Sequence, residues 1–168
     1  RDSLRGTKII FEEINHDLNL EFSYQWNVSD KYGFIKKSKL INKNIDNINI
    51  RILDGVQNIL PWGLEQPTQN NTSNLVDAYK RSELEVKSGL GIFALSSIIV
   101  DKAEPSEALK ANVVWSLGFK TSQKLLSSSQ LKKFREEGLI NQEVDIKAEK
   151  GAYFINTEVN LKEKKKKK

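Results

Sequence analysis

Apolar and polar residues alternate along several short segments of the chain, and this two-residue period predicts β-strands. The clearest segment covers residues 18–26, where alternate positions are apolar or aromatic: Leu18, Leu20, Phe22, Tyr24 and Trp26. The residues between them are polar. Because successive side chains of a strand point to opposite faces, the pattern predicts one buried and one wet face. Trp26 is therefore predicted to lie in the core.

The same period predicts strands over 48–52, 83–87, 113–119 and 153–161. Residues 8–14 are predicted to form a strand because they are rich in β-branched residues, and residues 32–41 another, with Lys36, Lys37 and Lys39 towards water. The alternation over 113–119 also predicts that Trp115 is a core residue. A nearly continuous apolar run over 90–100 predicts a central strand covered on both faces. Turn residues separate these segments, with Asp54-Gly55 predicted to end the fourth strand and Ser88-Gly89 to form a hairpin. The first four strands are expected to form a sequential antiparallel meander.

Helical signals are sparse. A short helix is predicted over 129–137, with Ser129 as the N-cap and Gly138 as the residue that ends it. Residues 75–81 could add one or two helical turns, and a loop over 101–110 contains a helix start at Glu104. Residues 61–74, rich in Pro, Gly, Gln, Asn and Thr, are predicted to be the longest irregular stretch. About eight strands and one short helix predict a mostly-β fold, an antiparallel β-sandwich.

Length and charge distribution predict one folded domain followed by a tail. The chain has 168 residues, enough for a single core, and we assign residues 1–161 to one β-sandwich domain. Its last seven residues, 162–168, hold six Lys and one Glu and so carry the whole net charge of +5; this tail is expected to be disordered. The chain starts at Arg1 and contains no Met, which leads us to expect a fragment of a longer protein.

Composition argues against several classes of site. The chain has no Cys, a single His, His16, without paired ligands, and no G-x-S-x-G sequence, so neither a zinc site nor a serine-hydrolase site is predicted. It has no phosphate-binding glycine loop, and we expect no cofactor and no metal. The apolar run over 90–100 is shorter than the ~20 residues of a membrane-spanning helix, so no membrane partner is expected. The Lys-rich tail lacks interleaved aromatic residues, so no nucleic acid is expected either.

Acidic residues do not indicate a catalytic pair. Glycoside hydrolysis requires two carboxylates at a defined separation across a sugar. The carboxylates predicted at loops or strand ends are Asp54, Glu65, Asp77, Glu83 and Glu104. Solvated turn residues are the simpler interpretation of each, and we predict no catalytic residue.

Trp62 is the most informative aromatic residue. It lies in Pro61-Trp62-Gly63 among amide side chains, and sugar-binding sites combine flat rings with neighbouring amides. A ring in a polar loop docks against another domain, stacks on a ligand, or folds back on its own core. We take four residues as candidates for ligand binding or interdomain contact: Trp62, Gln57, Asn58 and Gln66.

Several segments of the chain together resemble a known family. The segments are Asn15-His16-Asp17-Leu18, Phe22-Ser23-Tyr24-Gln25-Trp26, Asp30-Lys31-Tyr32-Gly33-Phe34, Leu53-Asp54-Gly55-Val56-Gln57-Asn58-Ile59-Leu60-Pro61 and Val114-Trp115-Ser116. Over roughly residues 7–161 the chain resembles the N-terminal β-sandwich region of large bacterial proteins related to cellobiose phosphorylase and similar glycoside hydrolases. That region is a super-sandwich of the galactose-mutarotase type.

The resemblance implies a division of labour between this chain and the rest of a larger enzyme. In the family, a following (α/α)₆ barrel holds the catalytic acid, and the sandwich supplies loops to the rim of the active site and to dimer contacts. The chain is then expected to be a non-catalytic domain whose partners are a carbohydrate, the missing catalytic domain and a second copy in a homodimer. The alternatives are a stand-alone carbohydrate-binding module and a structural or interaction domain.

Overall fold

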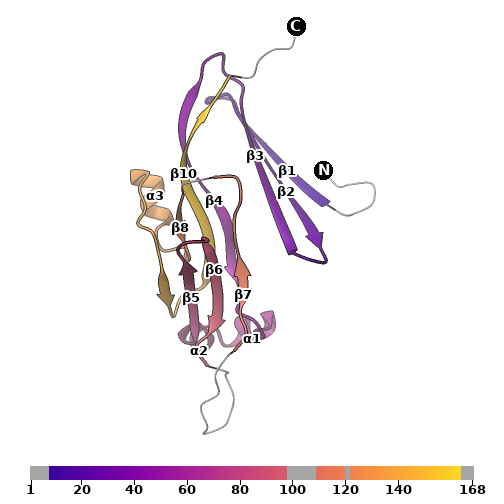
Figure 1. Ribbon diagram of the computed structural model, residues 1–168, viewed down its shortest axis with the longest axis vertical. Coiled ribbons are helices and arrows are strands. Elements are labelled where there is room, and N and C mark those ends of the chain that lie inside the picture. The colour runs from indigo at the N-terminus through magenta and orange to yellow at the C-terminus, as the bar shows by residue number, and fades with distance from the viewer. Residues whose placement is uncertain (1–7, 98–108, 120–121, 164–168) are drawn as a thin grey trace. The chain divides into compact units, whose positions relative to one another are not determined.

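The structure, a computed structural model, describes residues 8–97, 109–119 and 122–163. Within them the chain forms ten strands and three short helices (Figure 1): β1 (Lys8–Asn15), β2 (Leu20–Ser29), β3 (Gly33–Asn42), β4 (Ile48–Ile59), α1 (Gln66–Asn71), α2 (Ser73–Ala78), β5 (Lys80–Glu85), β6 (Leu90–Leu95), β7 (Asn112–Val114), β8 (Gln123–Leu125), α3 (Leu131–Glu137), β9 (Asp145–Lys147) and β10 (Gly151–Leu161). The neighbouring strands pair in antiparallel fashion, as the residue-by-residue pairing shows for β1 with β2, β2 with β3, β5 with β6, β5 with β9, β6 with β7 and β8 with β10. The predicted mostly-β, antiparallel class is confirmed.

The strands form three sheets, and the chain divides into two compact units. The sheet orders are β1-β2-β3, β4-β10-β8 and β7-β6-β5-β9. One unit comprises residues 1–50 and 159–168, and the other comprises residues 51–158. Along the chain, β4 and β10 pass from one unit into the other. The assignment of residues 1–161 to one domain and of 162–168 to a tail stays a prediction. No helix among the described residues is long and apolar enough to cross a membrane.

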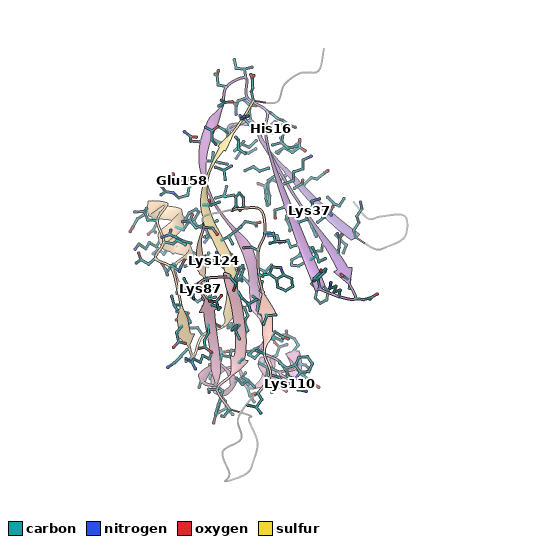
Figure 2. All side chains as sticks on the ribbon, in the orientation of Figure 1. His16, Lys37, Lys87, Lys110, Lys124 and Glu158 are labelled. Atoms are coloured by element: carbon teal, nitrogen blue, oxygen red, sulfur yellow. The ribbon has the colours of Figure 1, made fainter. Side chains whose placement is uncertain are left out.

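The first unit contains the meander β1-β2-β3. Its first turn is fixed locally, because the Asn15 side chain accepts a hydrogen bond from the Leu18 backbone N–H at 2.9 Å. His16 lies exposed in this turn (Figure 2). Leu18 also lies in the turn and is 59% exposed, so the strand begins at Leu20 and the prediction that Leu18 is buried is wrong.

The apolar side chains of β2 lie on one face of this sheet, as the alternation predicts, but Lys36 and Ser38 of β3 share that face. The register places Trp26 opposite Ile9, Tyr24 opposite Phe11, and Val28 opposite Phe34. The rings of Phe11 and Tyr24 stack with their centroids 4.9 Å apart. Burial is nevertheless incomplete, since Phe34 is 80% exposed and Trp26 is only partly buried, so Trp26 is not the core residue predicted. Alternation determines which side chains share a face, but it does not determine whether a second layer covers that face.

The fourth strand does not continue the meander. It lies beside β10, and it runs through Asp54-Gly55 to Ile59 without a turn, which corrects the predicted strand end. The physical reason is close approach of the two backbones. A Cβ added at Gly55 would lie 2.0 Å from the carbonyl oxygen of Tyr153 and 2.7 Å from Cα of Phe154. Gly55 therefore allows β4 to pack closely on β10 and does not form a turn.

The second unit has a core between its two sheets. Five buried residues form this cluster, with Leu84 and Phe93 from one sheet, Tyr153 and Ile155 from the other, and Leu126 from a connecting loop. The opposite face of β10 contributes Ala152 and Phe154 to a second cluster, against which α3 packs. Residues 151–156 of β10 are thus buried on both faces, and the alternation predicted for this segment appears only from Thr157 onwards. The segment predicted at 90–100 forms β6, which lies centrally between β5 and β7 but ends at Leu95. Only Gly91 and Phe93 of β6 are buried, so the predicted cover on both faces is wrong for this strand; residues 98–100 lie outside the described residues.

The segment 113–119 differs from its prediction in extent and in direction. Only Asn112–Val114 is a strand, at the edge of its sheet, and Val114 packs on the core. The predicted inward positions point outward, so Val113 is 47% exposed and Trp115 is 43% exposed. Pairing with β6, which sets Val114 opposite Gly91, decides this parity. The prediction that Trp115 is a core residue is therefore wrong.

The helical predictions are confirmed in part. Helix α3 matches the predicted segment and ends at Gly138, which adopts the left-handed conformation with φ of 67°. Its N-cap is Gln130 rather than the predicted Ser129, and both side chains donate hydrogen bonds to the carboxylate of Glu143. Two helices, α1 and α2, occupy most of the stretch predicted to be irregular. The helix start predicted at Glu104 lies outside the described residues.

Replacing Gly55 by Ala should destabilise the second unit strongly. The new methyl group meets backbone atoms that cannot rotate away, so we expect a loss of about 3 kcal/mol in the free energy of unfolding. Denaturant titration followed by circular dichroism measures this loss. The matched control is Gly63→Ala, where φ is +77° but no atom lies within 4 Å, and where the cost should be only about 1 kcal/mol. Equal losses in the two variants would contradict the close approach of β4 and β10.

Candidate functional site

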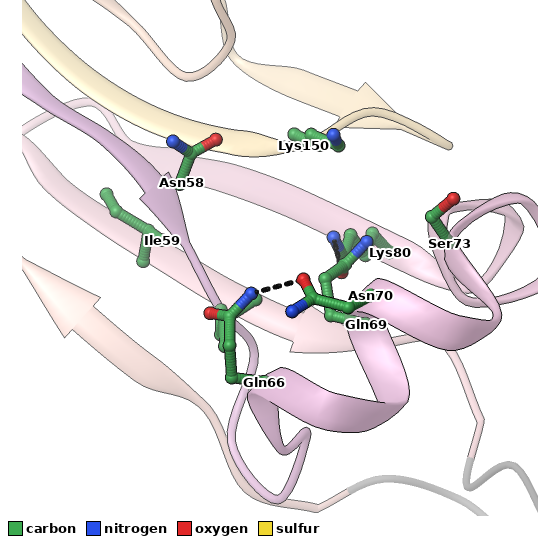
Figure 3. Close-up of a pocket in the computed structure, with 9 residues that line it drawn as sticks. Asn58, Ile59, Gln66, Gln69, Asn70, Ser73, Lys80 and Lys150 are labelled. Carbon is green, nitrogen blue, oxygen red and sulfur yellow. Dashed lines mark hydrogen bonds between the residues drawn. The ribbon is translucent and has the colours of Figure 1, made fainter.

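A polar cleft of about 520 Å³ lies where the end of β4 meets α1 (Figure 3). Four amide side chains line it: Asn58, Gln66, Gln69 and Asn70. Ser73, Lys80 and Lys150 add a hydroxyl group and two ammonium groups. Figure 3 shows Asn58 and Lys150 on the strand side of the cleft and the amides of Gln66, Gln69 and Asn70 on the helix side. Every one of these residues belongs to the second unit.

Lys80 is the most deeply buried charge at the cleft. Its side chain is only 2% exposed, and its ammonium group donates a hydrogen bond to Asp77 Oδ1 at 2.7 Å and another to Gln69 Oε1. Gln69 Nε2 in turn donates to Asp77 Oδ1 at 3.2 Å. A buried ammonium group is stable only when it is paired and hydrogen-bonded, and these contacts supply both conditions. The three side chains therefore form a closed hydrogen-bonded cluster, which we call the Lys80 triad; Lys80 and Gln69 of this triad line the cleft.

The Lys80 triad changes the acidity of Asp77. Burial alone would raise the pKa of this carboxyl group, but hydrogen bonds from Lys80 and Gln69 and the nearby positive charges of Lys80 and Lys150 outweigh it. The net effect is a pKa below the usual value of Asp. Asp77 is therefore an ionised structural partner and not a poised general acid.

Helix α1 presents its amides in a fixed arrangement. It starts after Glu65 and has Pro67 in its first turn, where a missing N–H costs nothing. Gln66 Nε2 donates to Asn70 Oδ1 at 2.8 Å across one helical turn, which holds both side chains at the cleft. Opposite them, Asn58 has φ of 57°, a left-handed conformation that Asn tolerates better than most residues.

Trp62 lies in the turn that leads from β4 to α1. The Leu64 N–H donates to the Pro61 carbonyl oxygen at 3.3 Å and closes this turn. Trp62 is 53% exposed as a residue, and the ammonium group of Lys110 lies 5.3 Å from the centroid of its ring. Trp62 belongs to neither core cluster, so the structure argues against the interpretation that this ring folds back on its own core.

Two of the four candidate residues line the cleft. These are Asn58 and Gln66, while Trp62 lies two residues from Leu60, which also lines it. Gln57 is exposed on β4 and is not part of the lining. The spacing 66, 69, 70 is that of one helical face and was a usable signal for the α1 amides once a helix is assumed there. Lys80 and Lys150 gave no signal in sequence, because only tertiary contacts show that a lysine is buried or close to another group.

The remaining candidates for chemistry have other roles or stay untested. Glu83 pairs with Arg81 at 2.9 Å, and Glu104 lies outside the described residues. Among the described residues no group of three or more His, Cys, Asp and Glu side chains could hold a metal ion.

No family model matches the chain, and no curated protein matches it. The resemblance to proteins related to cellobiose phosphorylase therefore stays a prediction.

Stability should fall at acidic pH through Asp77. Because its pKa is lowered in the folded state, its contribution to stability is present above the unfolded pKa of about 4 and is lost as pH falls through the folded pKa. Asp77→Asn should cost about 2 kcal/mol at pH 7 and should flatten the stability curve below pH 4. Denaturant titrations from pH 7 to pH 2 measure both effects. Glu137→Gln, which removes the same charge from exposed α3, is the control, and an identical acid profile of Asp77→Asn and wild type would refute the Lys80 triad.

Proposed function

We propose that this chain is a non-catalytic β domain of a carbohydrate-active enzyme, and that its polar cleft binds a saccharide. The observation that carries the proposal is the set of amides fixed around the cleft, with an exposed tryptophan in the adjoining turn. The resemblance to the sandwich region of cellobiose phosphorylase-related proteins agrees with it. The roles of that region at the rim of an active site and in interdomain or dimer contacts remain part of the proposal.

The chemistry of the cleft suits sugar hydroxyl groups. Each hydroxyl both donates and accepts hydrogen bonds, and each amide side chain offers the same two functions on neighbouring atoms. The α1 amides of Gln66 and Asn70 are already oriented by their mutual bond, so little conformational freedom is lost when a ligand binds. The volume of about 520 Å³ lies within the usual range of small-molecule sites, about 300–1,000 Å³.

Trp62 would supply the apolar contact. The flat face of an indole ring stacks on the C–H face of a pyranose, while the ring edge stays in water. With 53% of its surface exposed, Trp62 is accessible for such a contact.

The proposal assigns turnover to another part of the parent enzyme. Cleavage of a glycosidic bond needs two carboxyl groups on opposite sides of the sugar, and the residues that line the cleft in the described chain include neither Asp nor Glu. Asp77 lies behind Lys80 and is held ionised. We therefore expect the chain to bind β-glucosides without hydrolysing or phosphorolysing them.

Binding can be tested by calorimetric titration with cellotetraose. Calorimetry is needed because Trp62→Ala removes a fluorescent reporter together with the contact. Trp62→Ala and Gln66→Ala should each weaken binding about tenfold, the effect of losing roughly 1.4 kcal/mol of stacking or hydrogen bonding.

Gln57→Ala is the matched control, because Gln57 is an amide on the same strand as Asn58 but outside the cleft. Its affinity should equal that of wild type. The proposal fails if no saccharide binds, or if binding survives unchanged in both Trp62→Ala and Gln66→Ala.

A further inference from the structure

The charged side chains that line the cleft are all positive. Lys80 and Lys150 both reach it, and no carboxylate belongs to the described lining. Asp77 compensates Lys80 from behind, so the ammonium group of Lys150 is the surplus charge. Binding of neutral hydroxyl groups does not require an extra positive charge, because the amides already provide hydrogen-bond donors and acceptors.

One of the three N–H groups of the Lys80 ammonium has no acceptor within the described chain. An ammonium group carries three N–H donors, and within the described chain Nζ of Lys80 makes two hydrogen bonds, to Asp77 and Gln69. The side chain is almost fully buried and belongs to the residues that line the cleft, and we take its third N–H as the donor for a group that enters there. A charged acceptor forms the stronger hydrogen bond with such a donor.

Lys150 is held close to the same place by the backbone. The Ala148 N–H donates to the Lys80 carbonyl oxygen at 3.0 Å, which ties the segment before β10 to β5. Gly151, the next residue after Lys150, packs so tightly that an added Cβ would lie 2.8 Å from the Ile59 carbonyl oxygen. The charge of Lys150 also contributes to the lowered pKa of Asp77, which places its ammonium group within electrostatic range of the Lys80 triad.

We propose that the preferred ligand of this cleft is an anionic saccharide, whose carboxylate or sulfate group binds the ammonium groups of Lys150 and Lys80. The inference rests on the proposed function and names its ligand class. Hydroxyl groups of the same sugar bind the amides of α1, and the acidic substituent gives the selectivity. Lys150 is the specificity residue, because its charge has no carboxylate partner among the residues that line the cleft.

Calorimetric titrations with three tetrasaccharides test the proposal. The ligands are cellotetraose, which is neutral, tetragalacturonate, which carries carboxylates, and a heparin-derived tetrasaccharide, which carries sulfates. At low salt, at least one acidic ligand should bind tenfold or more tightly than cellotetraose. The preference should shrink when NaCl is raised to 0.5 M, because salt screens the interaction of partly exposed charges. Comparing the two acidic ligands identifies the anionic group.

Two charge-matched variants separate a specific contact from general attraction. Lys150→Gln should bring the acidic ligand to the affinity of the neutral one, whereas Lys87→Gln, at an exposed hairpin position of the same unit (Figure 2), should retain the preference.

The outcomes distinguish this inference from the proposed function. If cellotetraose binds as tightly as both acidic ligands, or if Lys150→Gln keeps the preference, the anionic ligand is refuted while saccharide binding stands. If none of the three ligands binds, the proposed function fails and the inference fails with it.

Discussion

The contact between β4 and the first half of β10 is the constraint on which the second unit depends. β10 is buried on both faces from Gly151 to Asn156, one face on the core between the sheets and the other on the cluster that receives α3. Glycines at both ends of the contact allow it. Gly55 lies against the backbone of Tyr153, and Gly151 lies against the carbonyl oxygen of Ile59, at distances that exclude a Cβ. Two layers of apolar packing therefore share one central strand.

The same contact places the cleft. Lys150 immediately precedes β10, and Asn58 and Ile59 are the last two residues of β4. Because Gly151 packs closely on Ile59, Lys150 and Asn58 both line the cleft from its strand side. Lys80 is the first residue of β5, and its carbonyl oxygen accepts a hydrogen bond from the Ala148 N–H. Asp77 of α2 and Gln69 of α1 accept hydrogen bonds from its ammonium group. The charged side chain of Lys80 can be buried only because these elements hold its hydrogen-bond partners in place. The position of the Lys80 triad is thus a consequence of the fold.

Sequence patterns predicted local features well, but they failed where contacts between distant segments determine the role or position of a residue. Strand β2 follows from alternation, β1 from its β-branched residues and β6 from a nearly continuous apolar run, and the end of α3 follows from Gly138. Gly55 was misinterpreted as a turn residue because a glycine in sequence does not reveal whether it permits a reversal or a close approach. Trp115 was assigned to the core because the alternation was extended to residue 119, whereas β7 ends at Val114. In the cleft, Asn58 and Gln66 were identified from composition near Trp62, whereas Lys80 and Lys150 depend on contacts between distant segments.

Native-state amide hydrogen exchange tests the central role of β10 most directly. The Ala152 N–H donates to the Leu126 carbonyl oxygen at 2.8 Å inside the core, whereas β1 is an edge strand whose residues are mostly exposed. We expect the amides of residues 152–156 to exchange only through global unfolding of the second unit, and those of β1 to exchange much faster through local opening. Exchange of the β10 amides at the rate of the β1 amides would contradict the account.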